Sequence, residues 1–121
     1  MAETITTYII EQEKEPSIIG VTVNFDYAKQ IWQKNVRESV KNDIFNSVKP
    51  SIQCITTNSK GNVVNQEECG ILITYDDESD NPIHLSIYGG LNITDNTFLD
   101  EIYTLVKINY DNLLQKLISG Y

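Results

Sequence analysis

The sequence predicts a single α+β domain, in which helices pack against a twisted antiparallel sheet. Three observations predict this fold class. Short runs of β-branched residues alternate with turn residues in the middle of the chain, and apolar residues repeat at helical spacing near its end. A length of 121 residues with 40% hydrophobic content also suits one domain with a core, so residues 1–121 are treated as one domain.

Residues 4–13 allow two interpretations. Ile5, Tyr8 and Ile9 stand at the i, i+3 and i+4 spacing of a helix. The threonines and isoleucines of the same stretch are β-branched and favour a strand instead. Pro16 ends the element in either case, so the sequence leaves helix and strand open here.

The next stretch leads from a strand towards a helix. Residues 17–25 alternate in polarity late in the run and predict a strand. A short piece around Ile31 and Trp32 fits either a second strand or the lead-in to the helix that follows.

The middle helix is predicted from an apolar residue at every fourth position between Val36 and Val48. Asn35 and Glu38 have the spacing of a capping box, which places the start of the helix at Asn35. Pro50 marks its end.

Three strands are predicted after this helix. The runs are residues 52–57, 70–75 and 83–88. Asn, Asp, Ser and Gly residues between them supply the backbone geometries that hairpins need. In the third run, Ile83, Leu85 and Ile87 point to one side and the residues between them to the other.

The last helix has the clearest pattern, an apolar stripe over about six turns. Its members are Phe98, Ile102, Val106, Tyr110, Leu113, Leu114 and Leu117. Asp95, Asn96 and Thr97 are candidates for its N-terminal cap, and Gly120 stands where a C-terminal cap is expected.

The formal charge of −8 is distributed unevenly along the chain. Residues 1–60 carry seven basic and seven acidic side chains, whereas residues 61–121 carry ten acidic ones and only Lys107 and Lys116. Because negative charge repels phosphate backbones and anionic lipids, we expect no nucleic-acid partner and no membrane partner. The same charge favours binding to basic protein surfaces.

The sequence offers little for catalysis. His84 is the only imidazole, and no glycine-rich phosphate-binding motif occurs. The acidic run at residues 76–80 lacks the mid-loop glycine and the terminal glutamate of a calcium loop, and indicates a solvated turn. We therefore expect no enzyme activity, no small-molecule substrate, no metal and no cofactor.

Cys54 and Cys69 lie in apolar, strand-like runs without a CxxC pair, which predicts buried thiols in a reducing compartment. No apolar run of 18 residues and no signal-peptide pattern occur. These features indicate a cytoplasmic protein.

Three aromatic residues suggest a binding surface. If the first and last elements are neighbouring helices on one face of the sheet, then Tyr8, Trp32 and Tyr121 form a shallow aromatic shelf. Such a shelf suits a proline-rich peptide, whose polyproline II conformation is already stiff.

Several stretches, together spanning the whole chain, resemble the profilin family. ETITTYII is similar to the family's first helix, with Tyr8 at the place of a Tyr and Ile5 where the family has Trp. SIIGVTVNFDYAKQIW resembles its first two strands, which end at Trp32. IHLSIYGG resembles its last strand, and LLQKLISGY its terminal helix with a closing aromatic, Tyr121.

This resemblance implies a fold and a function. The fold is a central antiparallel sheet with N- and C-terminal helices on one face and a middle helix on the other. The function is binding of actin monomers to regulate filament assembly in the cytoskeleton, with weak binding of proline-rich peptides at Tyr8, Trp32 and Tyr121. The actin-binding face corresponds here to Lys60, Asn62, Tyr75, Tyr88, Asn92, Asn96 and Phe98. Ile5 and Gln115 depart from the family's aromatic pattern and weaken the polyproline expectation.

Two other hypotheses follow from the residues. The acidic second half suits a small inhibitor, such as an immunity or anti-defence protein, that blocks a basic surface of its partner. The expected mixture of helices and antiparallel sheet also suits a scaffold or assembly-chaperone domain that dimerises.

Overall fold

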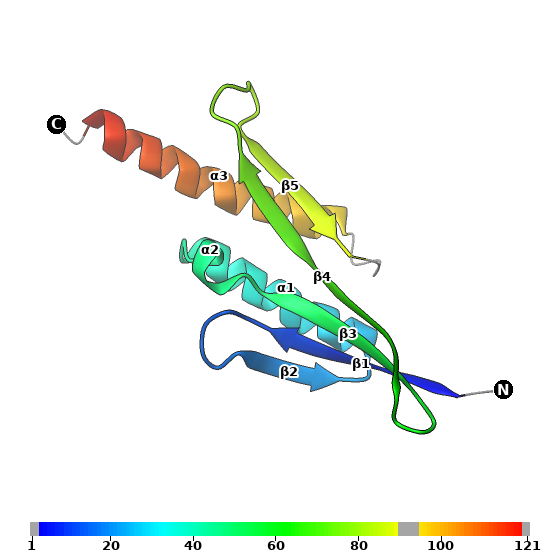
Figure 1. Ribbon diagram of the computed structural model, residues 1–121. Coiled ribbons are helices and arrows are strands. Elements are labelled where there is room, and N and C mark those ends of the chain that lie inside the picture. Colours follow the sequence, from blue (N-terminus) through cyan, green and yellow to red (C-terminus); the bar gives the residue numbers. More distant parts are fainter. Residues whose placement is uncertain (1–2, 90–94, 120–121) are drawn as a thin grey trace.

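The computed structural model describes residues 3–89 and 95–119, and these form an α+β domain (Figure 1). The elements are β1 (Thr4–Glu11), β2 (Ile18–Thr22), α1 (Phe25–Lys41), α2 (Phe45–Val48), β3 (Ser51–Asn58), β4 (Val63–Tyr75), β5 (Ile83–Tyr88) and α3 (Asn96–Ser119). The strands form one sheet in the order β2-β1-β3-β4-β5, and every neighbouring pair is antiparallel. The fold class predicted from the sequence is confirmed.

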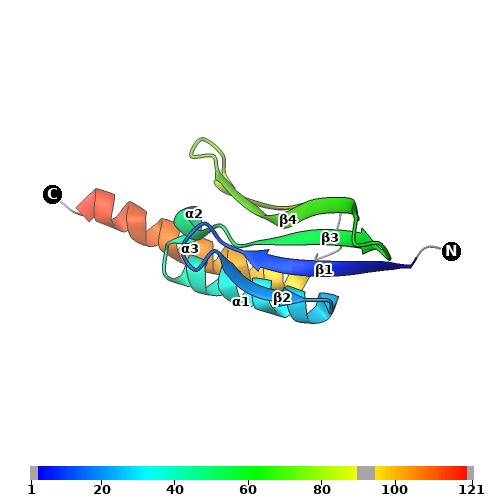
Figure 2. The ribbon, with the colours of Figure 1, turned by 60° about the horizontal axis from the view of Figure 1, so that its bottom comes forward.

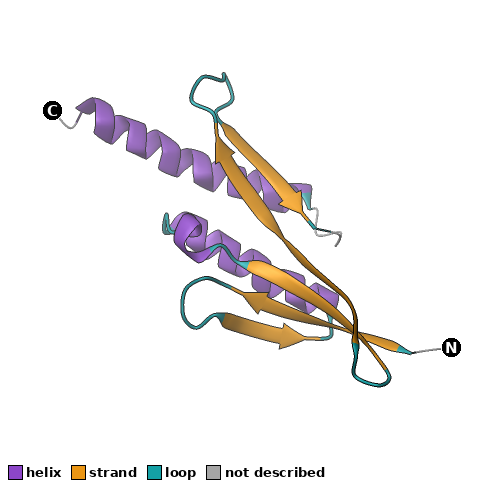
Figure 3. Cartoon of the chain, viewed as in Figure 1, coloured by secondary structure: helices purple, strands orange, loops and turns teal. Residues whose placement is uncertain are grey.

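The opening segment is a strand, and the helical alternative for residues 4–13 is wrong. β1 is hydrogen-bonded on both sides, to β2 and to β3 (Figure 3). Its β-branched side chains find cross-strand partners there: Ile10 lies opposite Ile52, and the hydroxyls of Thr6 and Thr56 are 3.0 Å apart. These pairs explain why strand propensity prevails over helical spacing.

Trp32 belongs to a helix, so its interpretation as part of a second strand is wrong. α1 begins after Asn24, whose Oδ1 accepts a hydrogen bond from the Tyr27 amide at 2.9 Å. Asn35, the expected cap, lies inside the helix and donates its side-chain amide to the Ile31 carbonyl. The helix therefore starts about three turns earlier than its capping-box pattern predicts.

Both long helices cover the same face of the sheet (Figure 2). α1 packs on β1, β2 and β3, and α3 packs on β5 and on α1. The rings of Trp32 and Phe98 meet at 5.4 Å inside a single core, which also contains Ile10 and Ile83. The middle helix was expected on the face of the sheet opposite to the terminal helix. This expectation is wrong, because the apolar side of α1 packs into the same core as α3. No described helix covers the other face of the sheet.

β4 joins two parts of the sheet. Its first half pairs with β3 and its second half with β5, and Gly70 has a partner on both sides, Ser51 and Tyr88. Cys54 and Cys69 are buried on the helix-covered side, as the sequence predicts. None of the described helices is both long enough and apolar enough to span a membrane.

Candidate protein-interaction surface

The apolar stripe of α3 is buried in its first half and exposed in its second half. Phe98, Ile102 and Val106 are at most 4% exposed. Leu113 and Leu117, which continue the same stripe two and three turns after Val106, are 56% and 58% exposed. Such a run of exposed leucines on a polar molecule is typical of an interaction surface.

The difference arises because α1 is shorter than α3. The two helices contain 17 and 24 residues, respectively. The Asn109 side-chain amide donates to the Val40 carbonyl at 2.6 Å, close to the last turn of α1. The next ten residues of α3, about 15 Å of helix, extend beyond α1 (Figure 1). We call this segment, residues 110–119, the overhang.

A groove lies between the overhang, the end of β4 and the junction of α1 with α2. We call it the overhang groove. Its apolar lining consists of Tyr75, Tyr110, Leu113, Leu114 and Leu117. Asp43, Asp77 and Asn109 complete its walls.

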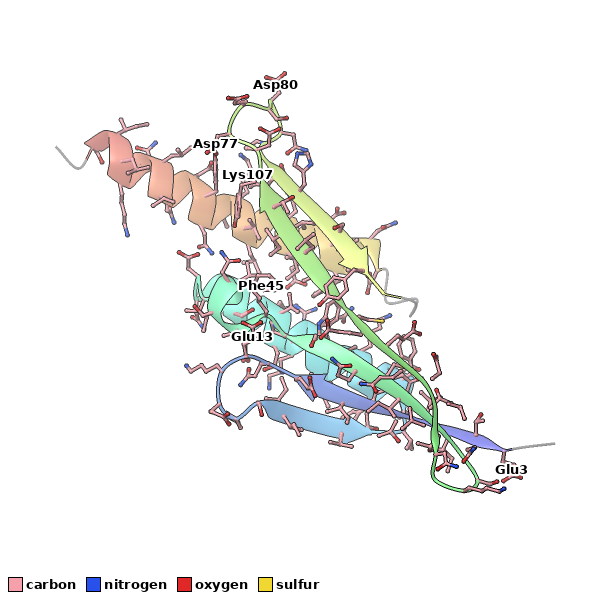
Figure 4. All side chains as sticks on the ribbon, in the orientation of Figure 1. Glu3, Glu13, Phe45, Asp77, Asp80 and Lys107 are labelled. Atoms are coloured by element: carbon pink, nitrogen blue, oxygen red, sulfur yellow. The ribbon has the colours of Figure 1, made fainter. Side chains whose placement is uncertain are left out.

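Two tyrosines hold the turn between β4 and β5 against α3. The ring of Tyr75 stacks on that of Tyr110 with centroids 6.0 Å apart, and the Tyr110 hydroxyl donates to Asp77 Oδ1 at 2.8 Å. Two turns earlier on the helix, the Tyr103 hydroxyl donates to Asn81 Oδ1 at 2.9 Å. These contacts fix the turn beside the start of the overhang, as Figure 4 shows for Asp77 and Asp80.

The groove has a negative potential. Asp43 lies on one side of it and Asp77 on the other, and the turn carries three further acidic residues, Asp76, Glu78 and Asp80. Burial and the nearby charge of Asp43 raise the pKa of Tyr75. The hydrogen bond to Asp77, with burial and nearby carboxylates, raises the pKa of Tyr110. A ligand for this surface therefore combines apolar groups with positive charge.

The single imidazole of the sequence lies outside the overhang groove. His84 is exposed on the helix-free face of β5, opposite Thr74 of β4. No three His, Cys, Asp or Glu side chains of the described part of the chain are placed to hold a metal ion. The side chains that line the overhang groove suit contact with a surface that combines apolar groups and positive charge.

The residues expected to bind proline-rich peptides do not form a shelf among the described residues. Trp32 is fully buried, and its indole Nε1 donates to the Pro50 carbonyl at 3.0 Å. Tyr8 is partly buried in β1 and contacts Phe25 at 5.6 Å between centroids. Tyr121 lies outside the described residues. Glu3 and Ser119, the two described ends of the chain, lie at opposite ends of the molecule (Figures 1 and 2).

The residues that the resemblance assigns to an actin-binding face are dispersed. Lys60 and Asn62 lie in the turn before β4 and Tyr75 at its far end, about 40 Å away along the strand. Tyr88 lies on the helix-free face at the end of β5, and Phe98 is buried. Asn96 is the exposed first residue of α3, and Asn92 lies outside the described residues. The described members of this set do not gather on one surface.

Sequence reasoning placed the leucines of the overhang on one continuous apolar stripe and assigned the acidic turn to solvent, without identifying a binding surface. A signal for the surface was nonetheless present. The apolar stripe at the end of the chain is longer than any preceding helix or strand that could cover it. Comparison with protein-family models, with curated proteins and with solved structures found no match for this chain.

Proposed function

We propose that this protein binds a partner protein through the overhang groove and blocks a basic surface of that partner. One observation carries the proposal: leucines continue the core stripe of α3 into solvent and are bordered there by Asp43 and Asp77. Apolar area supplies most of the binding energy in such surfaces, and complementary charge supplies rate and selectivity. The excess of negative charge in residues 61–121 supports the same choice of partner.

A capture experiment tests this proposal. The immobilised protein and its Leu113→Ser/Leu117→Ser variant are exposed to extract of the source cells at about 0.05 M NaCl and washed at about 0.5 M NaCl. We expect the protein to retain a basic partner that the variant loses, and the high-salt wash to release it. Adding the protein to the partner's own activity assay then lowers that activity.

A control variant on another exposed apolar surface accompanies this test. Ile18 and Val21 of β2 are 55% and 60% exposed, away from the overhang groove. Ile18→Ser/Val21→Ser should retain the partner as the unaltered protein does. The proposal would be contradicted if both double variants lost the partner equally, or if the captured partner were acidic.

Binding of actin monomers, which the resemblance to profilin implies, stays a prediction. The strand at residues 4–11 and the burial of Trp32 remove two of the observations that led to it. An assay of pyrene-labelled actin checks it directly: a profilin-like activity changes nucleation or elongation at micromolar concentrations of this protein.

A further inference from the structure

The first half of α3 shows how its apolar stripe is covered inside the molecule. α1 lies beside it and runs in the same direction: Arg37 pairs with Glu101 at 2.8 Å, and further along both helices Asn109 bonds to Val40. Packing of helix against helix is thus the arrangement that this stripe already adopts. Beyond Asn109, no described element continues the line of α1 (Figure 1).

We propose that the partner places an amphipathic α-helix with basic flanks in the overhang groove, in line with α1. This inference rests on the function proposed above and names the form of the group that is bound. In this arrangement the docked helix packs against the overhang as α1 packs against the first half of α3.

The spacing of the exposed residues supports a helix as the occupant. Tyr110, Leu113, Leu114 and Leu117 stand at i, i+3, i+4 and i+7, which is the pattern that two packed helices share. Added strands, in contrast, need a free sheet edge to supply backbone hydrogen bonds. The long wall of this groove is a helix, whose backbone groups are bonded within the helix itself.

A small cavity beside the groove suits an anchoring side chain. It has a volume of about 70 Å³ and shares Asp43, Tyr75 and Asn109 with the groove. Its lining mixes apolar side chains, such as Phe45 of α2 and Val106 of α3, with polar residues of α2 (Figure 4 labels Phe45). A short side chain of the docked helix fits a space of this size.

The charges on the two sides of the groove define the flanks of the docked helix. Asp43 and Asp77 both line the groove together with the leucines, Asp43 from the α1–α2 junction and Asp77 from the β4–β5 turn. Lysine or arginine residues on both sides of an apolar stripe would meet one carboxylate each. A second copy of this chain, with its own charge of −8, lacks this complementarity.

The test uses two synthetic peptides of about 15 residues with identical Leu and Lys composition. In the first, leucines stand at i, i+3, i+4 and i+7, and in the second they alternate with lysines. Fluorescence anisotropy measures the binding of each peptide to the full chain, and circular dichroism measures the helix formed on binding. We expect the first peptide to bind at least ten-fold more tightly and to gain helix.

Two neighbouring residues of α3 provide matched protein variants. Leu117 lines the groove, whereas Ile118, which is 76% exposed, does not line it. Leu117→Ser should weaken binding of the first peptide about ten-fold, and Ile118→Ser less than two-fold. Equal effects of the two substitutions would overturn the assignment of the site.

The remaining outcomes separate this inference from the proposed function. Equal binding of the alternating peptide without a gain of helix would show that the occupant is not a helix. Absence of binding by both peptides, together with a successful capture experiment, would show the same. In both cases the proposed function stands. If the first peptide binds as expected but the capture experiment fails, the proposed blocking function is wrong. A dimer in sedimentation that Leu117→Ser disperses would identify a second copy as the occupant and overturn the inference.

Discussion

In the first half of α3 the stripe residues are buried against α1 and the sheet, whereas in the second half Leu113 and Leu117 of the same stripe are more than half exposed. The residue types are alike in both halves, so the difference comes from the neighbours alone. α1 ends next to the hydrogen bond between Val40 and Asn109, and the buried core ends at the same level. An apolar stripe thus predicts that a surface will be covered, and the length of the neighbouring helix decides whether the same chain covers it.

The largest expected difference between the halves is in stability. Replacing fully buried Ile102 by Ala should lower the free energy of unfolding by about 2–5 kcal/mol, because apolar contacts are lost and a cavity remains. Replacing exposed Leu117 by Ala should change it by less than about 0.5 kcal/mol. Urea denaturation measures both values. Similar losses at the two positions would mean that the overhang is covered in solution.

A smaller loss of stability is expected on substitution of Trp32. Its side chain connects α1 to the first half of α3 and to the segment before β3. Trp32→Phe removes the indole donor of the buried Pro50 carbonyl and part of the contact with Phe98. We expect a loss of about 1–3 kcal/mol in the free energy of unfolding. The same denaturation experiment checks it, and an unchanged midpoint would show that the Pro50 carbonyl finds another donor.

The boundary between the two halves of α3 lies at Asn109, and a pair of substitutions tests it. Asn109→Ala removes the hydrogen bond to Val40 and should cost about 0.5–1.5 kcal/mol. Asn112→Ala, at an exposed position one turn later, should be nearly neutral. If both substitutions cost the same, the contact between the ends of the two helices does not contribute to stability.

The smallest effect concerns the pH dependence at the start of the overhang. Because the pKa of Tyr110 is raised above 10.0, its stabilising effect is present below that pH and is lost as the pH rises through the folded-state pKa. The difference in stability between the protein and Tyr110→Phe should therefore shrink above pH 10. Absorbance titration of the phenolate, with Tyr110→Phe as the reference, should give a lower midpoint after Asp77→Asn, because the hydrogen bond to the carboxylate is the main cause of the shift.

Much of the fold could be predicted from the sequence where the local pattern and tertiary contacts agree. The strand at residues 83–88 and the helix that begins near Asn96 are examples. Residues 4–11 could not be decided, since their helical spacing and their β-branched side chains disagree and the pairing with β2 and β3 settles the outcome. The sequence suggested that Trp32 contributes to an aromatic shelf with Tyr8 and Tyr121, but no local pattern reports that its ring packs against Phe98 of α3.

The candidate site was beyond prediction for a different reason. Leu113 and Leu117 have the same pattern as the buried residues before them, so sequence alone places them in the core. Their exposure follows from where α1 stops, and the capping-box pattern at Asn35 misplaced even the start of that helix. The acidic residues that border the groove come from two distant loops, which meet only in the folded chain.

The connectivity of the chain keeps the overhang open. α1 ends at Lys41, and Asp43 adopts a left-handed backbone conformation with a φ angle of 58°, which turns the chain into α2. Only nine residues separate Lys41 from Ser51, where β3 must begin opposite Glu11. Two more turns of α1 would use about seven of these residues and leave too few to return to the sheet. α1 therefore cannot extend over these leucines without unravelling the start of β3, and the described part of the chain leaves them open to a partner.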